Sequence, residues 1–302
     1  MWVMVTGATG FIGSNVVKAL LKRNIKVIVL VRDINKINEE WKENVVYIKF
    51  DMCCESDYSK LKDYPIDTFF HFSWMGTAGE MRKDIDCQLD NVKYSCRLMK
   101  SAKEAGCKRF IYAGSIMEYE VMNYLIKDSS LPSAGMIYST AKLTADFMLK
   151  TLANTLEIEY INVLISNVYG AGERSSRFLN TTLRKMLKNE SIELTQGKQL
   201  YDFIYISDAV NAIVSAAFNG KAGTSYYIGN KNQIELREYI EKMKKIVNSN
   251  SELLFGKIPF YNAMLSYKEF DTGKVEDELS IIYEYDFEKG ILEMVKELEK
   301  NE

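Results

Sequence analysis

The sequence predicts an α/β fold in which helices cover both faces of a doubly wound parallel sheet, with a smaller α/β lobe at the C-terminus. Two observations predict this fold. Short runs of β-branched residues alternate with helical stretches over the first 165 residues, and a glycine-rich turn follows the first of these runs. Strands that alternate with helices form βαβ units, which build parallel sheets covered on both faces. With 302 residues, the chain is long enough to bury a sizeable core.

The elements of the first part are predicted from residue type and spacing. Short runs of β-branched and aromatic residues favour strands, and apolar residues at helical spacing favour helices. We expect strands at Val3–Thr6, Val27–Val31, Val45–Phe50, Thr68–Phe72, Arg109–Ala113 and Tyr160–Ile165, and helices at Ile12–Arg23, Met81–Ala105 and Ile137–Leu156.

Beyond Ser166 the alternation becomes irregular, which places the domain boundary there. Residues 1–165 are expected to form the first domain and residues 166–302 the lobe, with residues 202–223 returning to the first domain. Residues 119–135 are expected to form a long loop, and such loops often cover substrate sites. In the second part we expect helices at Phe178–Lys188, Asp208–Asn219, Leu236–Val247 and Phe287–Lys300, and a strand at Ser225–Ile228.

Composition excludes several classes of function. The net charge of −2 gives no electrostatic reason to bind nucleic acid or an anionic membrane. Five cysteines without metal-site spacing and a single histidine argue against a zinc site and favour free thiols. No apolar run reaches the roughly 18–20 residues that span a bilayer, and glycines interrupt the apolar N-terminus, unlike a signal peptide. We therefore expect a cytoplasmic protein without a metal.

The glycine-rich turn comprises Gly7, Gly10 and Gly13, between a short strand and an amphipathic helix. In this context the first glycine permits a tight turn, the second lets the backbone approach a pyrophosphate, and the third lets the helix pack on the strand. The helix N-terminus adds free N–H groups and a partial positive charge that favour an anion. The alternative is a turn that is merely rich in glycine. The order of strand, turn and helix favours a dinucleotide site.

The end of the second strand indicates which dinucleotide binds. An acidic residue there accepts hydrogen bonds from the ribose 2′-hydroxyl of NAD, whereas an arginine accommodates the 2′-phosphate of NADP. The strand ends at Val31, and Arg32 is the first polar residue after it. NADP(H) is therefore favoured over NAD(H). Asp33 keeps NAD open, and Arg32 could also be a solvated loop charge.

Tyr138 and Lys142 lie four residues apart in a predicted helix, so both occupy one face. Free tyrosine titrates near about 10, too high for acid–base work at neutral pH. A cation within ~4–6 Å lowers that pKa, so Tyr138 could exchange a proton with a carbonyl or hydroxyl oxygen. The spacing alone is common by chance. Ser115 strengthens the prediction, because it follows a strand at the sheet edge where ligands bind, and its hydroxyl could contact the same oxygen.

These residues together resemble the extended short-chain dehydrogenase/reductase family of nucleotide-sugar epimerases, dehydratases and reductases. Matching segments run along nearly the whole chain: TGATGFIG at 6–13, HFSW at 71–74, the trio at 115, 138 and 142, NVYG at 167–170 and YDFIYISD at 201–208. The resemblance implies a Rossmann-type dinucleotide-binding domain and a substrate-binding lobe. It implies cofactor contacts from Gly7, Thr9, Gly10, Phe11, Ile12, Gly13, Arg32, Asp51, Met52, Phe72, Ser73, Trp74, Asn91, Tyr138 and Lys142.

The resemblance also implies a substrate site, with three departures from the family pattern. Dehydratases of the family carry Asp-Glu after the catalytic hydroxyl residue, whereas Ile116 and Met117 follow Ser115, so a 4,6-dehydratase is not expected. Arg32 resembles the NADP-dependent members, most of which are reductases. Tyr201 stands where many members have a phosphate-contacting arginine. The substrate contacts implied are Trp74, Ser115, Asn167, Arg174, Arg177 and Tyr201, with the two arginines as possible replacements for the missing one.

The segments resemble most closely the CDP-abequose synthase-like reductases. That subgroup implies reduction of a CDP- or dTDP-linked 4-keto-6-deoxyhexose at C4. A 4-epimerase with tightly held NAD is the alternative enzyme, and a non-catalytic dinucleotide-binding redox sensor is the alternative from another class. The family also implies a homodimer, in which the helices Met81–Ala105 and Ile137–Leu156 of two subunits form a four-helix bundle.

Several residues near the predicted site allow two interpretations. Trp74 and Met75 either form a wall of the cofactor or sugar pocket or fill a lobe interface. His71, at the end of a buried strand, is expected to be a packed core residue rather than a proton carrier. Glu118 and Glu120 either orient the sugar or are surface-loop carboxylates.

Overall fold

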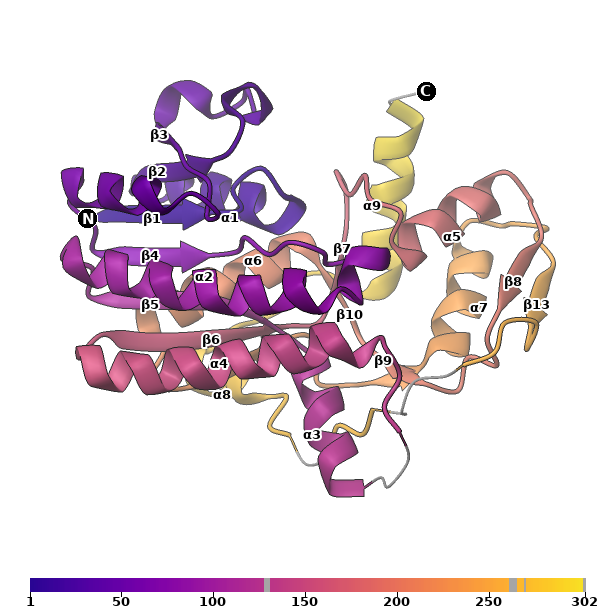
Figure 1. The fold of residues 1–302 in the computed structure, drawn as a ribbon. Helices are drawn as coiled ribbons and strands as arrows, with labels where there is room; N and C mark the ends of the chain where they lie inside the picture. The colour runs from indigo at the N-terminus through magenta and orange to yellow at the C-terminus, as the bar shows by residue number, and fades with distance from the viewer. Residues whose placement is uncertain (128–130, 261–264, 269, 301–302) are drawn as a thin grey trace.

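The computed structural model describes residues 1–127, 131–260, 265–268 and 270–300, and a seven-stranded sheet runs through its centre (Figure 1). The strand order is β11-β6-β5-β4-β1-β2-β3, and every neighbouring pair is parallel. These strands are β1 (Trp2–Thr6), β2 (Lys26–Val31), β3 (Val46–Lys49), β4 (Thr68–His71), β5 (Arg109–Ser115), β6 (Glu159–Ile165) and β11 (Ser225–Ile228).

Helices cover both faces of this sheet. α2 (Ile85–Glu104) and α4 (Met136–Leu156) lie side by side on one face, and α1 (Phe11–Lys22) packs against α6 (Ile206–Asn219) on the other (Figure 1). Side chains alternate along each strand, so one strand feeds two cores. In β1, Val3 and Val5 belong to the core under α1 and α6, and Met4 belongs to the core under α2 and α4. The doubly wound parallel sheet is thereby confirmed.

A second set of short elements lies beyond the carboxyl ends of the main strands (Figure 1). Its strands form three two-stranded pairs, β10 with β7, β12 with β9 and β13 with β8. These elements are β7 (Asn167–Tyr169), α5 (Phe178–Leu187), β8 (Ile192–Leu194), β9 (Leu200–Tyr201), β10 (Phe203–Tyr205), β12 (Ile234–Glu235), α7 (Leu236–Ile246), β13 (Leu253–Phe255) and α9 (Phe287–Lys300). The short helix α8 (Lys274–Leu279) packs instead against α6 and β11 of the main sheet region.

The strands and helices expected from the sequence are present, most of them within a few residues of the predicted ends. The division into two domains stays a prediction. Strand β11, which begins after residue 223, pairs with β6 and therefore belongs to the main sheet. All five cysteines are free, as expected.

The long loop predicted at 119–135 is wrong over its first half. Residues 117–127 form helix α3 (Met117–Lys127), and residues 128–130 lie outside the described residues. Tyr119 explains the helix, because its ring stacks on Phe270 at 3.5 Å between centroids and also packs near Tyr227. These partners come from distant segments, so the local sequence gave no indication of them.

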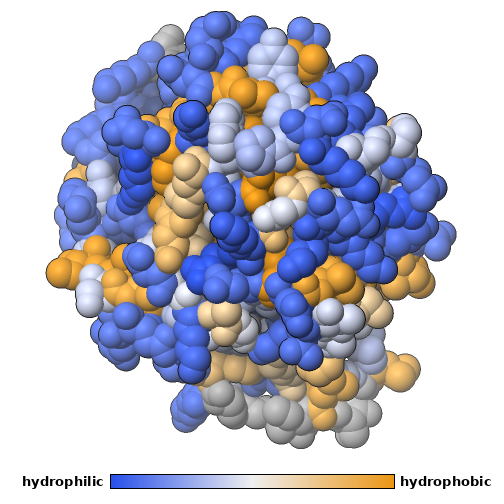
Figure 2. Space-filling view, turned by 90° about the vertical axis from the view of Figure 1, so that its left-hand side faces the viewer, coloured by the Kyte–Doolittle hydropathy of each residue, from blue (hydrophilic) through white to orange (hydrophobic). Residues whose placement is uncertain are grey.

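The two edges of the main sheet differ in character. The face that carries the amino ends of the strands is largely hydrophilic, with small separate hydrophobic patches (Figure 2). The polar residues predicted to do chemistry lie at the opposite, carboxyl edge, where open parallel sheets bind ligands. Within the described ranges, no helix is long and apolar enough to cross a membrane.

Candidate active site

The glycine turn after β1 has the geometry that a dinucleotide needs. Gly7 has φ +71°, and a Cβ there would lie 2.8 Å from the backbone of Phe72 and Ser73. A Cβ on Gly13 would lie 2.2 Å from the carbonyl oxygen of Gly7, so the first turn of α1 packs directly on the turn. No side chain caps the N-terminus of α1. The turn is therefore a backbone cradle, with helix N–H groups that favour an anion.

A groove of about 260 Å³ runs from this cradle along the carboxyl edge of the sheet. It collects most of the residues that the sequence predicted as cofactor contacts, together with Met75. The groove is lined by Thr6, Gly7, Thr9, Gly10, Leu30, Val31, Arg32, Phe50, Asp51, Met52, Phe72, Ser73, Trp74 and Met75.

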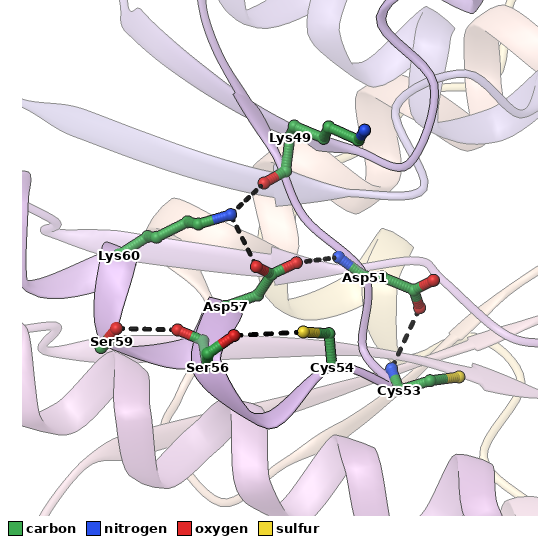
Figure 3. A network of polar contacts seen from close by, with 8 residues as sticks. All are labelled: Lys49, Asp51, Cys53, Cys54, Ser56, Asp57, Ser59 and Lys60. Carbon is green, nitrogen blue, oxygen red and sulfur yellow. Dashed lines mark hydrogen bonds and ion pairs between the residues drawn. The ribbon is translucent and has the colours of Figure 1, made fainter.

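The segment after β3 is fixed by a polar network beside the groove (Figure 3). The Asp57 carboxylate accepts hydrogen bonds from the Asp51 backbone N at 2.8 Å and from Lys60 Nζ at 2.6 Å, and Lys60 also donates to the Lys49 carbonyl. The Lys60 hydrogen bond lowers the pKa of Asp57. The Asp51 side chain points away from this cluster, and its Oδ1 accepts from the Cys53 backbone N. The network holds Asp51 at the groove.

Arg32 and Asp33 take different directions at the end of β2. Arg32 lines the groove with an exposed side chain. Asp33 caps a short turn of its own loop, where its Oδ1 accepts from the Asn35 backbone N at 3.0 Å. One oxygen of the acidic residue is therefore engaged locally, whereas the arginine faces the groove.

The structure brings Ser115, Tyr138 and Lys142 together. Ser115 ends β5, and the other two lie one turn apart on α4. Tyr138 is 7 % exposed and Lys142 is 5 % exposed. Burial raises the pKa of Tyr138, while the charge of Arg82 and a hydrogen bond with Ser115 lower it. The Ser115 side chain therefore forms part of the polar surroundings of the Tyr138 phenol.

The ammonium of Lys142 does not have the surroundings that the sequence suggested. Its Nζ donates to the Ala113 carbonyl at 2.8 Å and lies 3.8 Å from the centroid of the Trp74 ring. Burial lowers the pKa of Lys142 to about 7, and attraction to Glu118 opposes this effect. The expectation that Lys142 brings the pKa of Tyr138 below its ordinary value is not met, because burial of the phenol outweighs the nearby charges.

Trp74 connects the groove to the trio. Its ring lines the groove, stands edge-on to the Tyr138 ring at 6.2 Å and covers the Lys142 ammonium. Its Nε1 donates to Gln88 Oε1 at 2.8 Å. Of the two interpretations offered by the sequence, the structure places Trp74 and Met75 in the pocket wall.

Two residues at this site were missed in the sequence. Arg82 lies with its guanidinium carbon 3.9 Å from the centroid of the Tyr138 ring. Gln88 is 1 % exposed, and its Nε2 donates to the carbonyls of Met75, Gly76 and Met81, which fixes the loop that presents Arg82. Neither belongs to a motif. The only indication was a polar residue at a buried position of the predicted helix.

Asn91 and His71 lie behind the site. The Asn91 amide accepts from the Met75 backbone N and donates to the Met75 and Cys87 carbonyls, so its groups hold the loop after β4. His71 is 1 % exposed and bonds Thr6 and Ser95, each at 2.8 Å. Burial lowers the pKa of His71 to about 3. His71 is thus a neutral core residue, as expected.

Glu118 and Glu120 are not surface-loop carboxylates. Both are buried on α3, with exposed fractions of 0 % and 4 %. Glu120 Oε2 accepts from Ser139 Oγ at 2.9 Å. Glu118 Oε1 accepts from the Ser115 backbone N at 2.8 Å. The surface-loop interpretation is wrong, because a packed helix lies where a loop was expected, and a role in orienting the sugar stays a prediction.

The residues predicted for the substrate side lie on the short elements beyond the sheet. Asn167 begins β7, Tyr201 ends β9 and Arg177 caps α5. The charge of Arg177 lowers the pKa of Tyr138, and Arg82 affects the pKa of Tyr201, so these residues share the electrostatic surroundings of the trio. Arg174 is exposed and makes none of the described contacts with the trio.

Among the described residues, no group of three or more His, Cys, Asp or Glu side chains could hold a metal ion. The cradle and groove fit a dinucleotide instead, because only a backbone without Cβ atoms closes the turn.

Comparison with known proteins gives relatives of full length. The chain is 26 % identical over 301 residues to CDP-abequose synthase of Salmonella muenchen, covering 97 % of this chain and 96 % of that protein. It is 26 % identical over 268 residues to dTDP-4-dehydro-6-deoxyglucose reductase of Escherichia coli, covering 84 % of each.

Solved structures share the fold. UDP-glucose 4-epimerase of Thermotoga maritima, solved with UDP-glucose, has a TM-score of 0.82 at 20 % identity, covering 100 % of this chain and 99 % of that one. UDP-glucuronic acid 4-epimerase of Bacillus cereus, solved with UDP-glucuronic acid and NAD, has a TM-score of 0.79 at 21 % identity, with both chains covered completely. Residues 3–229 match the NAD dependent epimerase/dehydratase family. The chain therefore belongs to this family and is an NAD-dependent enzyme of the extended short-chain dehydrogenase/reductase type.

Proposed function

We propose that the enzyme reduces a nucleotide-linked 4-keto-6-deoxyhexose at C4, using NADPH in preference to NADH. One observation carries the proposal. Trp74 lines the dinucleotide groove and contacts both Tyr138 and Lys142, so the groove ends at the proposed acid and its partner cation.

Each member of the trio has a role in this reaction. Tyr138 gives its phenolic proton to the carbonyl oxygen, and Ser115 donates a hydrogen bond to the same oxygen. Lys142 binds the nicotinamide ribose. The glycine cradle, Asp51 and Met52 hold the rest of the cofactor. When bound, the reduced nicotinamide supplies the hydride.

The relatives and one departure support a reductase. CDP-abequose synthase and dTDP-4-dehydro-6-deoxyglucose reductase both match along most of the chain, which favours a CDP- or dTDP-linked substrate. Ile116 and Met117 occupy the positions where dehydratases of the family carry their acid–base pair. The exposed Arg32 in the groove supports NADPH, with Asn167, Arg174, Arg177 and Tyr201 proposed for the substrate diphosphate and sugar.

A panel of substrates tests the proposal. CDP-, dTDP-, UDP- and GDP-4-keto-6-deoxyhexoses are each incubated with NADPH or NADH, and the loss of absorbance of the reduced nicotinamide is followed. We expect stoichiometric oxidation with the CDP- or dTDP-linked sugar, faster with NADPH. No loss of nicotinamide absorbance with any of these sugars would contradict the reductase proposal.

A 4-epimerase is the second candidate, because the UDP-glucuronic acid 4-epimerase of similar fold is described with NAD. An epimerase oxidises and re-reduces the same carbon, so it keeps its cofactor. NAD retained through purification, with UDP-sugar interconverted and no net oxidation, would favour this candidate. A non-catalytic redox sensor would show neither result.

We further propose a homodimer through α2 and α4. A groove of about 510 Å³ runs between these helices, and Leu89, which is 57 % exposed, lines it. On α4, Phe147 and Met148 also expose apolar side chains, with exposed fractions of 72 % and 51 %. Exposed apolar groups on adjacent helices favour burial against a second copy. Light scattering after size-exclusion chromatography is expected to give twice the mass of the chain, and a monomeric mass would contradict the dimer.

A further inference from the structure

A buried carboxylate lies directly behind the proposed catalytic residues. Glu118, in the first turn of α3, is 0 % exposed. Its Oε1 accepts a hydrogen bond from the Ser115 backbone N at 2.8 Å, and its Oε2 accepts one from Asn162 Nδ2 at 3.1 Å. Burying a carboxylate is unfavourable unless partners satisfy its oxygens. Both partners here are N–H donors, which suit the ionised form.

Two side chains of opposite charge type bind the backbone between Ala113 and Ser115. Lys142 donates to the Ala113 carbonyl, and Glu118 accepts from the Ser115 N–H. At Gly114, between them, a Cβ would lie 2.2 Å from Asn162 Oδ1 and 2.7 Å from Glu118 Oε1. The end of β5 therefore closes directly onto the carboxylate, and a cation and an anion fix the strand segment that presents the Ser115 hydroxyl.

Titratable groups surround Lys142 on every element that packs against it. His71 is neutral, since its pKa is lowered to about 3, and Tyr112 is neutral, since burial raises its pKa well above the ordinary value. The remaining carboxylate is Asp146, which accepts from Tyr160 OH at 2.7 Å. Burial and the charge of Asp146 raise the pKa of Glu118, whereas the hydrogen bond from the Ser115 N–H, the charge of Lys142 and the hydrogen bond from Asn162 lower it. The facing groups are His71 from β4, Tyr112 from β5, Glu118 from α3, and Tyr138 and Asp146 from α4.

Of these groups, Glu118 is the one whose carboxylate binds the same backbone segment, residues 113–115, as the Lys142 ammonium. Burial lowers the pKa of Lys142, and attraction to Glu118 raises it. We propose that Glu118 is a positioning residue of the active site, which holds the backbone of Ser115 and supplies the counter-charge that keeps Lys142 an ammonium inside the protein. The inference rests on the proposed function for the roles of Ser115 and Lys142, but its test needs no substrate.

The test is a pH titration of Lys142 by NMR in protein labelled with [¹³Cε]lysine, with the Lys142 signal identified by its loss in Lys142→Arg. In Glu118→Gln, which removes the charge and keeps the shape, we expect the titration midpoint to fall by about 1–3 pH units. Asp208→Asn is the matched control. Asp208 is another buried carboxylate that accepts two backbone N–H bonds, from Glu284 and Tyr285. It is expected to leave the Lys142 midpoint unchanged.

The contrary outcome is a folded Glu118→Gln protein whose Lys142 midpoint matches that of the wild type. If this variant does not fold, the double variant E118Q/K142M decides. Recovery of the folded state when both charges are removed supports the proposal, and failure of the double variant to fold contradicts it, because the need for Glu118 would then not come from Lys142.

Failure of this inference is distinguishable from failure of the proposed function. A lowered Lys142 midpoint together with no turnover of any ketosugar overturns the function and leaves the role of Glu118 in place. An unchanged Lys142 midpoint together with normal turnover overturns the role of Glu118 and leaves the proposed function in place. Where turnover is found, the alkaline limb of the kcat profile is expected to move to lower pH in Glu118→Gln, which a merely structural role would not produce.

Discussion

The cofactor end and the reacting end of the site are built in different ways. The cofactor end depends on local backbone geometry, since Gly7 and Gly13 leave no room for a Cβ within one turn and helix. The reacting end depends on side chains brought together from distant elements, with Trp74, Arg82 and Glu118 placed around the trio on α4 and β5. Local geometry controls whether the dinucleotide binds. Buried charge controls whether the bound complex transfers a proton.

The largest effect is expected from Tyr138→Phe, which separates the two ends most sharply. Loss of the proton donor should lower kcat by about 10²–10⁴-fold, while NADPH binding changes little, because the groove is intact. Turnover and cofactor fluorescence titration measure the two quantities. Full turnover in this variant would contradict Tyr138 as the proton donor and would require another acid.

Gly13→Ala should act at the cofactor end. The new Cβ would lie 2.2 Å from the Gly7 carbonyl oxygen, and such overpacking costs about 1–3 kcal/mol. We expect a lower urea midpoint and weaker NADPH binding. Gly79→Ala provides a control with space for a Cβ, although its φ of +67° adds backbone strain. Equal NADPH affinity in wild type and Gly13→Ala would contradict the cradle.

Arg32→Ser should change cofactor choice rather than chemistry. A charge-assisted hydrogen bond to a phosphate contributes about 1.5–3 kcal/mol, so NADPH should bind roughly ten-fold or more weakly. NADH affinity should stay within about two-fold, because NADH lacks the 2′-phosphate. Isothermal titration calorimetry with NADPH and with NADH measures both affinities in the wild type and in Arg32→Ser. Parallel losses for NADH and NADPH would remove the basis for the NADPH preference.

The smallest effect is expected from Arg82→Met at the reacting end. Arg82 lowers the pKa of Tyr138, so its removal should raise that pKa. The ionisation of Tyr138 should then move to higher pH, and kcat should fall severalfold, since a cation on a ring face contributes about 0.5–2 kcal/mol. The pH profile of kcat measures both. If the limb of the kcat pH profile that reports the Tyr138 ionisation does not shift in Arg82→Met, Arg82 does not act on the phenol.

Sequence reasoning succeeded where the determinants are local. The glycine turn, the alternation of β1 to β6 and the spacing of Tyr138 and Lys142 each depend on neighbouring residues, and the structure bears out the corresponding elements. The wider set of groove residues followed from the family resemblance, which supplied the three-dimensional context that spacing lacks.

The same reasoning failed where tertiary contacts decide. Helix α3 was expected as a loop, and its Tyr119 stacks on Phe270, a partner about 150 residues away that local patterns do not indicate. A surface-loop position was therefore considered for Glu118, although its buried carboxylate accepts a hydrogen bond from the Ser115 backbone N. The effect of Lys142 on Tyr138 was overestimated, since burial acts on both groups and cannot be derived from a four-residue spacing.

We infer that a dinucleotide bound in the groove places its nicotinamide beside Ser115, Tyr138 and Lys142, and a crystal structure with bound NADP⁺ measures this placement. We expect the pyrophosphate on the turn of Gly7 to Gly13 and the Lys142 ammonium on the ribose hydroxyls instead of the Ala113 carbonyl. The nicotinamide ring is expected between Trp74 and the Tyr138 hydroxyl. A ring held outside contact with Tyr138 by Trp74, or a pyrophosphate bound away from the cradle, would contradict it.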